Sequence, residues 1–207
     1  MFDVNIYLDM ARLLGPPFTW SKFSEAAARQ SGSQVPSTDY RVDSLRAIAT
    51  TISGRFLGEE RLEVWTSHHI DDLAFDKLVQ PENGEVDEER GLGWSDEHAQ
   101  SFTDSFIDEL AFDMTSGGTI GDVEISYGSP PLSHEDGCVY RTAEASGAAN
   151  TFYRRFCITR DRDFRTATIP GDIVVLYPWE WLEYVRSARS RLATTAMRPR
   201  PATLPPA

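Results

Sequence analysis

The chain contains few cysteines and no cysteine pair of the metal-binding kind. Its 207 residues include only Cys138 and Cys157, with no C-x-x-C spacing. A cysteine-based metal site is therefore less expected than a disulfide between neighbouring strands. We expect both residues on strands, as small hydrophobes. A single bond between them stays open.

Long apolar runs are also missing. No stretch approaches the ~18 apolar residues of a membrane helix. The first residues carry Asp3 and Asp9, where a signal peptide needs positive charge. We therefore expect a cytoplasmic protein with no membrane partner.

The sequence lacks the familiar signatures of catalysis. It has no phosphate-binding G-x-x-x-x-G-K-[ST], no G-x-G-x-x-G, no H-E-x-x-H and no G-x-S-x-G. We expect no cofactor, and the sequence leans away from an enzyme.

Charge is present in quantity and is unevenly distributed. The net charge is −12, yet residues 1–58 carry +1, residues 59–136 carry −18 and residues 137–207 carry +5. The acidic middle segment repels itself unless cations, a basic partner or the Arg-rich last third screens it. Three interpretations stay open: a solvated face, a docking surface and a metal cluster.

Helical periodicity dominates the first half of the chain. We predict a helix up to Gly15, a second capped by Thr19, and a third over residues 39–56. Ser67 and Ser95 are predicted to cap two more. The Ser95 helix has a buried stripe, which consists of Ala99, Phe102, Phe106, Leu110 and Met114.

Later segments have the period of strands. We predict strands over residues 61–66, around residues 123–127, and over residues 138–143, 151–159 and 165–169; the apolar run Ile173–Tyr177 is expected to be a central strand. Pro178 is expected to start a final helix.

These elements together predict an α+β fold. Its N-terminal helices would be followed by a mostly antiparallel sheet of about four or five strands, closed by the C-terminal helix. We expect one domain over residues 1–196 and a Pro-rich tail over residues 197–207.

Two short segments combine histidine with carboxylates. His68, His69, Asp71 and Asp72 follow Ser67, and a helix start with acids in its first turn explains the same residues. His134 and Glu135 precede an Asp-Gly turn signal. The weak catalytic candidates are therefore His68, His69, His134 and Glu135. The weak metal candidates are His68, Asp71 and Asp72.

Asp104 and Asp108 stand one helical turn apart, on the side away from Phe102 and Phe106. They could hold a cation, but acids at this spacing also suit a solvated helix face.

Candidate binding residues come from the charged and aromatic groups. They are Glu85, Asp87, Glu88 and Glu89 in an acidic loop, Arg155 on a strand, and Trp179 and Trp181 near the last helix. Tyr153 and Arg155 could grip a nucleic acid, but the acidity of the chain argues against that partner. Trp179 and Trp181 are expected to point in different directions, with at least one exposed.

The sequence thus favours a non-enzymatic interaction or assembly protein, whose acidic surface engages a basic protein partner or another copy of itself. The alternative is a small metal-dependent hydrolase with a site around His68–Asp72 and His134.

Overall fold

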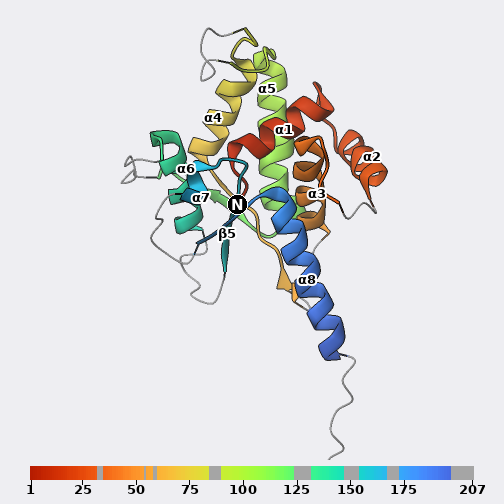
Figure 1. Ribbon diagram of the computed structural model, residues 1–207. Coiled ribbons are helices and arrows are strands. Elements are labelled where there is room, and N and C mark those ends of the chain that lie inside the picture. Colours follow the sequence, from red (N-terminus) through yellow and green to blue (C-terminus); the bar gives the residue numbers. More distant parts are fainter. Residues whose placement is uncertain are drawn as a thin grey trace, which may run out of the picture.

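The computed structural model describes most of the chain (Figure 1). The described residues are 1–31, 35–53, 55–57, 60–83, 90–123, 132–146, 154–166 and 173–196. Within them, no helix is long and apolar enough to cross a membrane.

Side-chain caps set the starts of several helices. α1 (Val4–Leu14) ends at Gly15, and α2 (Trp20–Gln30) begins after Thr19, whose hydroxyl accepts from the Lys22 amide. Ser67 and Ser95 cap α4 (His68–Val79) and α5 (Asp96–Phe102) in the same way. These predicted starts are confirmed. α3 (Tyr40–Ile52) begins as predicted after Asp39 but ends four residues early, since Arg55–Leu57 forms the strand β1.

Two π-helical segments continue α5. They are η2 (Thr103–Asp108) and η3 (Leu110–Met114). Figure 1 shows this continuous helix running through the centre of the molecule. Phe102, Phe106 and Leu110 are buried as predicted, but Met114 is 37% exposed. A π turn contains more residues than an α turn, so the α-helical period does not predict correctly which side Met114 faces.

The predicted four- or five-stranded antiparallel sheet is wrong. In the described residues, strands occur in three short pairs. β1 pairs with β2 (Glu60–Arg61) in antiparallel orientation. The other two pairs are parallel: β3 (Trp65–Ser67) with β4 (Gly118–Ile120), and β5 (Arg155–Ile158) with β6 (Ile173–Leu176). The fold is mainly helical. Residues 124–131, 147–153 and 167–172, on which other predicted strands fall, lie outside the described residues.

The strand predicted over residues 138–143 is also wrong. They form the middle of α6 (His134–Ala145), which begins with a capping box between Ser133 and Asp136. Cys138, Val139, Tyr140, Thr142 and Ala143 are all buried. A helix buried almost all round has no polar face to reveal its period, so the residues resembled a strand. Residues 163–166, part of another predicted strand, form the short helix α7 (Asp163–Thr166).

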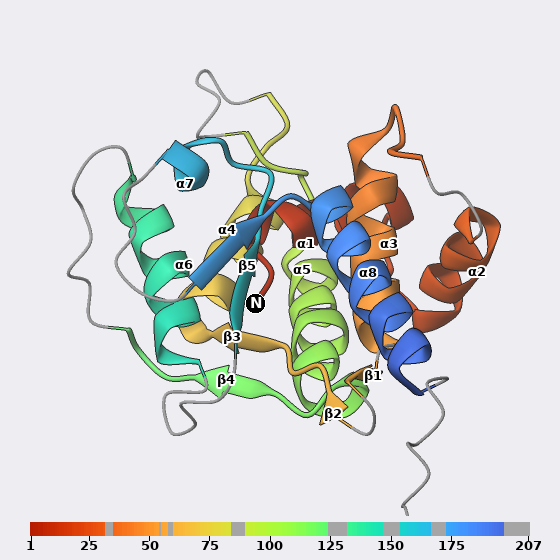
Figure 2. The ribbon, with the colours of Figure 1, turned by 60° about the horizontal axis from the view of Figure 1, so that its bottom comes forward.

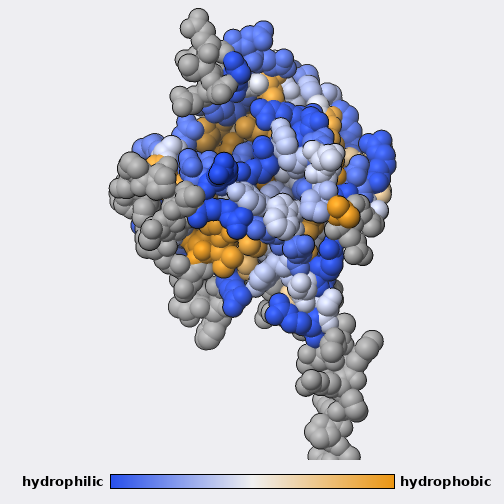
Figure 3. Space-filling model, viewed as in Figure 1, coloured by the Kyte–Doolittle hydropathy of each residue, from blue (hydrophilic) through white to orange (hydrophobic). Residues whose placement is uncertain are grey.

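The last strand is not central in the described part of the chain. β6 pairs with β5, and all four of its residues are only half-buried. On the other side of β5, Phe2 forms a parallel bridge with Ile158, and the Asp3 amide donates to the Ile158 carbonyl at 2.9 Å. Figure 3 shows an apolar area where β5 and β6 lie in the view of Figure 1.

α8 (Pro178–Ala196) packs along α3, and Figure 2 shows the two helices side by side. The Trp181 indole joins them by donating to the Thr51 hydroxyl at 2.9 Å. In Figure 2, α4 and α6 lie on the other side of α5. The core between these groups is rich in aromatic rings, with Phe106 at its centre.

Candidate functional site

The strand β3 delivers the first histidine segment to the start of α4. The Ser67 hydroxyl caps that helix and accepts a hydrogen bond of 2.8 Å from Thr142 on α6. This buried contact joins residues 75 positions apart. It holds the beginning of α4 against α6, whose first residues are His134 and Glu135.

The two histidine segments therefore converge. Burial lowers the pKa of His69, the Glu135 carboxylate opposes that change, and His134 adds to it. The Nε2 atom of His69 is buried, and no hydrogen-bond partner is found for it in the described part of the chain. His134 and Glu135 are exposed at the surface. Sequence alone had no signal for this meeting, because it depends on how α4 packs on α6.

The predicted metal residues face different partners. His68 Nδ1 lies 3.7 Å from an Asp122 carboxylate oxygen, and Asp71 accepts a hydrogen bond of 2.9 Å from the Thr66 hydroxyl. Asp72 is exposed. Among the described residues, no three His, Cys, Asp or Glu side chains form a group that could hold one metal ion.

Carboxylates of α4, of η2 and of the chain after β4 lie near one another or near His68, and we call this group the acidic face. Burial raises the pKa of Asp71, the hydrogen bond from Thr66 opposes that rise, and the nearby Asp108 and Asp72 carboxylates add to it, with a net pKa of about 7. Burial and Asp104 likewise raise the pKa of Asp108. The nearby His68 acts in the opposite direction and lowers the pKa of both carboxyls. The acidic face consists of Asp71, Asp72, Asp104, Asp108 and Asp122.

Arginines of the last third form their ion pairs with other acids. Arg160 pairs with Asp9 at 2.8 Å and Arg165 with Glu180 at 3.1 Å, while Arg141 pairs with Glu144. In the first third, Arg41 pairs with Asp39 and Arg46 with Asp43. All five of these acids lie outside the −18 segment, so these arginines do not screen the acidic face through direct ion pairs.

The Asp9–Arg160 pair belongs to a buried polar network that sequence reasoning missed. Asp9 is fully buried and accepts from Ser44 at 2.6 Å, while Arg160 stacks over the Tyr40 ring. Asp3 is also buried and accepts from Thr159 at 2.6 Å. Burial raises the pKa of Asp3 to about 7. The sequence did contain one signal for this network, because Asp9 stands among the apolar residues of the first helix.

The remaining binding candidates are spread over the molecule. Trp181 is 3% exposed and belongs to the core, whereas Trp179 is 37% exposed, which confirms that the two point in different directions. Arg155 is half-buried on β5. Glu85, Asp87, Glu88 and Glu89 lie outside the described residues. Both cysteines are free and buried, Cys138 on a helix rather than a strand.

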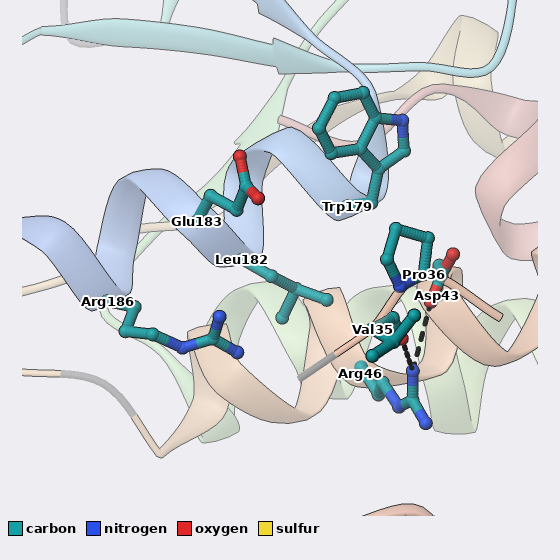
Figure 4. Close-up of a pocket in the computed structure, with 8 residues that line it drawn as sticks. All are labelled: Val35, Pro36, Asp43, Arg46, Trp179, Leu182, Glu183 and Arg186. Atoms are coloured by element: carbon teal, nitrogen blue, oxygen red, sulfur yellow. Dashed lines mark hydrogen bonds and ion pairs between the residues drawn. The ribbon is translucent and has the colours of Figure 1, made fainter. Parts of the chain in front are cut away.

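Trp179 borders a shallow pocket between α8 and residues 35–36 (Figure 4). Trp179 and Leu182 face Val35 and Pro36 there, and Arg46 donates to the Val35 carbonyl at 3.1 Å. The pocket holds about 20 Å³. That is room for one water molecule and not for an organic ligand.

Comparison with known proteins adds no relative. The chain matches no family model, no curated protein sequence and no solved structure.

The raised pKa of Asp71 predicts that the stability of the protein depends on pH. The unfolded chain loses this proton near pH 4 and the folded protein near pH 7, so the folded state holds more protons in between. Stability from this group therefore falls as the pH rises from 4 to 7. We expect Asp71→Asn, which keeps an acceptor for Thr66, to raise the free energy of unfolding at pH 8 by about 1–2 kcal/mol, less than the full shift would give because solvent screens the half-buried carboxylate.

Urea unfolding at pH 4.5 and pH 8 measures this effect. The exposed Asp76→Asn on the same helix is the matched control. If Asp71→Asn raised the free energy of unfolding equally at both pH values, the result would contradict a raised pKa of Asp71.

Proposed function

We propose that the chain is a protein-interaction module whose acidic face engages a basic surface of a partner protein. The observation that carries the proposal is that burial and neighbouring carboxylates raise the pKa values of Asp71 and Asp108 on α4 and η2, while five arginines pair with acids elsewhere. Charges of one sign held close together cost free energy in the isolated protein. A partner's guanidinium or ammonium groups would remove that cost.

The geometry of the acidic face supports a docking role. α4 and η2 pack against each other, so four of the five carboxylates are held on helices, and Asp122 lies in the chain after β4. Asp72, Asp104 and Asp122 are exposed, and Asp71 and Asp108 are half-buried behind them. Exposed charges speed association and half-buried charges add to affinity once a partner excludes water. The same face could dock on the arginines of another copy, which makes self-association a form of the same proposal.

Neutralising two charges of the face is the direct test. We expect Asp104→Asn with Asp108→Asn to weaken binding of a deca-arginine peptide by about tenfold, about 1.4 kcal/mol, and to reduce the salt dependence of binding. Isothermal titration calorimetry at 50 and 200 mM salt measures both quantities. Analytical ultracentrifugation of the same variant tests self-association.

The matched control removes two exposed carboxylates elsewhere, with Glu25→Gln on α2 and Glu183→Gln on α8. It changes the net charge by the same amount. Equal weakening in the two double variants would show that only total charge matters, and the acidic face would lose its role.

A metal-dependent hydrolase is the second candidate, motivated by the influence of His134 and Glu135 on the pKa of His69, although these three side chains do not form a metal-binding group in the described part of the chain. Imidazole and carboxylate are ligands that Zn²⁺ accepts. We expect Zn²⁺ to raise the melting temperature of the wild type more than that of His69→Gln if this candidate is correct. An equal response of the two proteins would remove it.

A further inference from the structure

A second concave feature lies between the end of α1, the start of α3 and the chain that follows α4. This hollow has a volume of about 380 Å³, within the range of small-molecule sites, roughly 300–1,000 Å³. None of the residues of the acidic face borders it. The lining residues are Ala11, Arg12, Gly15, Arg41, Glu82, Gly91, Leu92 and Trp94.

One wall of the hollow is held rigidly by backbone hydrogen bonds. The amides of Leu92, Gly93 and Trp94 donate to carbonyls at the end of α4, at 2.8 to 3.0 Å. A Cβ atom on Gly91 would lie 2.3 Å from the Gln80 carbonyl oxygen, so only glycine allows the chain to approach so closely there. The Trp94 ring packs edge-on against Phe102 at 5.7 Å. The wall is therefore preformed and anchored to the core.

Two guanidinium groups line the hollow in a protein of net charge −12. Asp39 binds the Nε and Nη2 atoms of Arg41, which leaves Nη1 without a partner in the described part of the chain. Arg12 is exposed, and Asp9, whose pKa it helps to lower, is already paired with Arg160. Both arginines can therefore donate to a carboxylate.

The same hollow contains a carboxylate and an apolar wall. Glu82 is exposed, and its side-chain stem lies beside Gly93. Leu92 and Trp94 are half-buried and offer apolar surface. Glu82 would repel a phosphate or a simple dianion, but it suits a ligand that carries an ammonium group as well as a carboxylate.

We propose that this hollow binds a free amino acid with an apolar side chain. The carboxylate of the ligand pairs with Arg12 and Arg41, its ammonium group pairs with Glu82, and its side chain packs on Leu92 and Trp94. Arg12 can form a bidentate pair with the ligand carboxylate, which gives such a site its orientation, and Arg41 adds a bond from Nη1. The site is independent of the acidic face, so either can fail without the other.

Isothermal titration calorimetry with apolar L-amino acids, leucine and phenylalanine first, tests the proposal. We expect Arg12→Gln to weaken binding at least tenfold and Arg29→Gln, an exposed arginine on α2 outside the hollow, to change it less than twofold. The N-acetyl derivative is expected to bind at least tenfold more weakly than the free amino acid to the wild type. Glu82→Gln is expected to abolish that difference. Trp94→Phe should remove the fluorescence change on binding.

The contrary results are equally definite. Absence of binding by all apolar amino acids at 10 mM would overturn the site. Equal binding of the free and N-acetyl forms by the wild type, or equal effects of Arg12→Gln and Arg29→Gln, would overturn the assignment of the ligand groups.

Discussion

Replacing Arg160 with methionine is expected to lower the free energy of unfolding by about 3–5 kcal/mol, the cost of removing one partner from a buried ion pair. The Asp9 carboxylate is fully buried and takes hydrogen bonds from Arg160 Nη2 at 2.9 Å and from Ser44 at 2.6 Å. Without the guanidinium, a negative charge would stay in the core with only a neutral donor. The variant also loses the stacking of the Arg160 guanidinium on Tyr40, in which the Cζ atom lies 4.1 Å from the ring centroid.

The loss is expected to depend on pH. Burial already raises the pKa of Asp9, and Arg160 counteracts that rise. Without Arg160 the pKa rises further, and the folded variant then binds a proton that the unfolded chain releases. The destabilisation should therefore be smaller at pH 5 than at pH 8.

Two variants complete the experiment on this pair. Arg162→Met changes an exposed arginine two residues away and is expected to alter stability by less than about 0.5 kcal/mol. Asp9→Asn combined with Arg160→Met should recover part of the loss, because it removes the buried charge. If Arg160→Met cost no more than Arg162→Met in urea unfolding, the pair would have no role in stability.

Replacing Phe106 with alanine is expected to cost about 3–5 kcal/mol, the usual range for removing a buried phenylalanine. The ring is fully buried at the centre of the core. Its centroid lies 4.7 Å from that of Phe18 and 5.0 Å from that of Phe102. Rings of α1 and α2, those of Tyr7 and Phe23, pack against it at 6.1 and 6.0 Å. Alanine would leave a cavity bordered by three helices and the loop before α2.

The control is on the same continuous helix. Phe112 is 56% exposed, and Phe112→Ala is expected to change stability by less than about 0.5 kcal/mol. Urea unfolding followed by circular dichroism compares the two variants. If Phe106→Ala and Phe112→Ala lowered the free energy of unfolding by similar amounts, Phe106 would not contribute to the core as the structure indicates.

Helix starts could be predicted because they depend on local chemistry. Thr19, Ser67 and Ser95 each cap the amide three residues ahead, and that bond needs nothing from the rest of the chain. The opposite exposure of Trp179 and Trp181 followed from the helical period for the same reason.

Strands and candidate sites were harder because they depend on distant partners. Residues 138–143 carry apolar and β-branched side chains that suit either a strand or a helix buried all round. Their neighbours α4, β3 and β5 decide between the two. The Ser133–Asp136 capping box was a local signal for the helix, and a turn explained the same residues equally well.

The sequence by itself determined the uneven charge, the first helices and the absence of standard catalytic motifs, since each is a property of neighbouring residues. Tertiary structure alone decided which charges distant in the sequence meet. Packing brought Arg160 to Asp9 across 151 positions, placed Asp108 near Asp71, and placed His69 near Glu135. The physical reason is that electrostatic interactions depend on distance in space and on burial, and neither can be read along the chain.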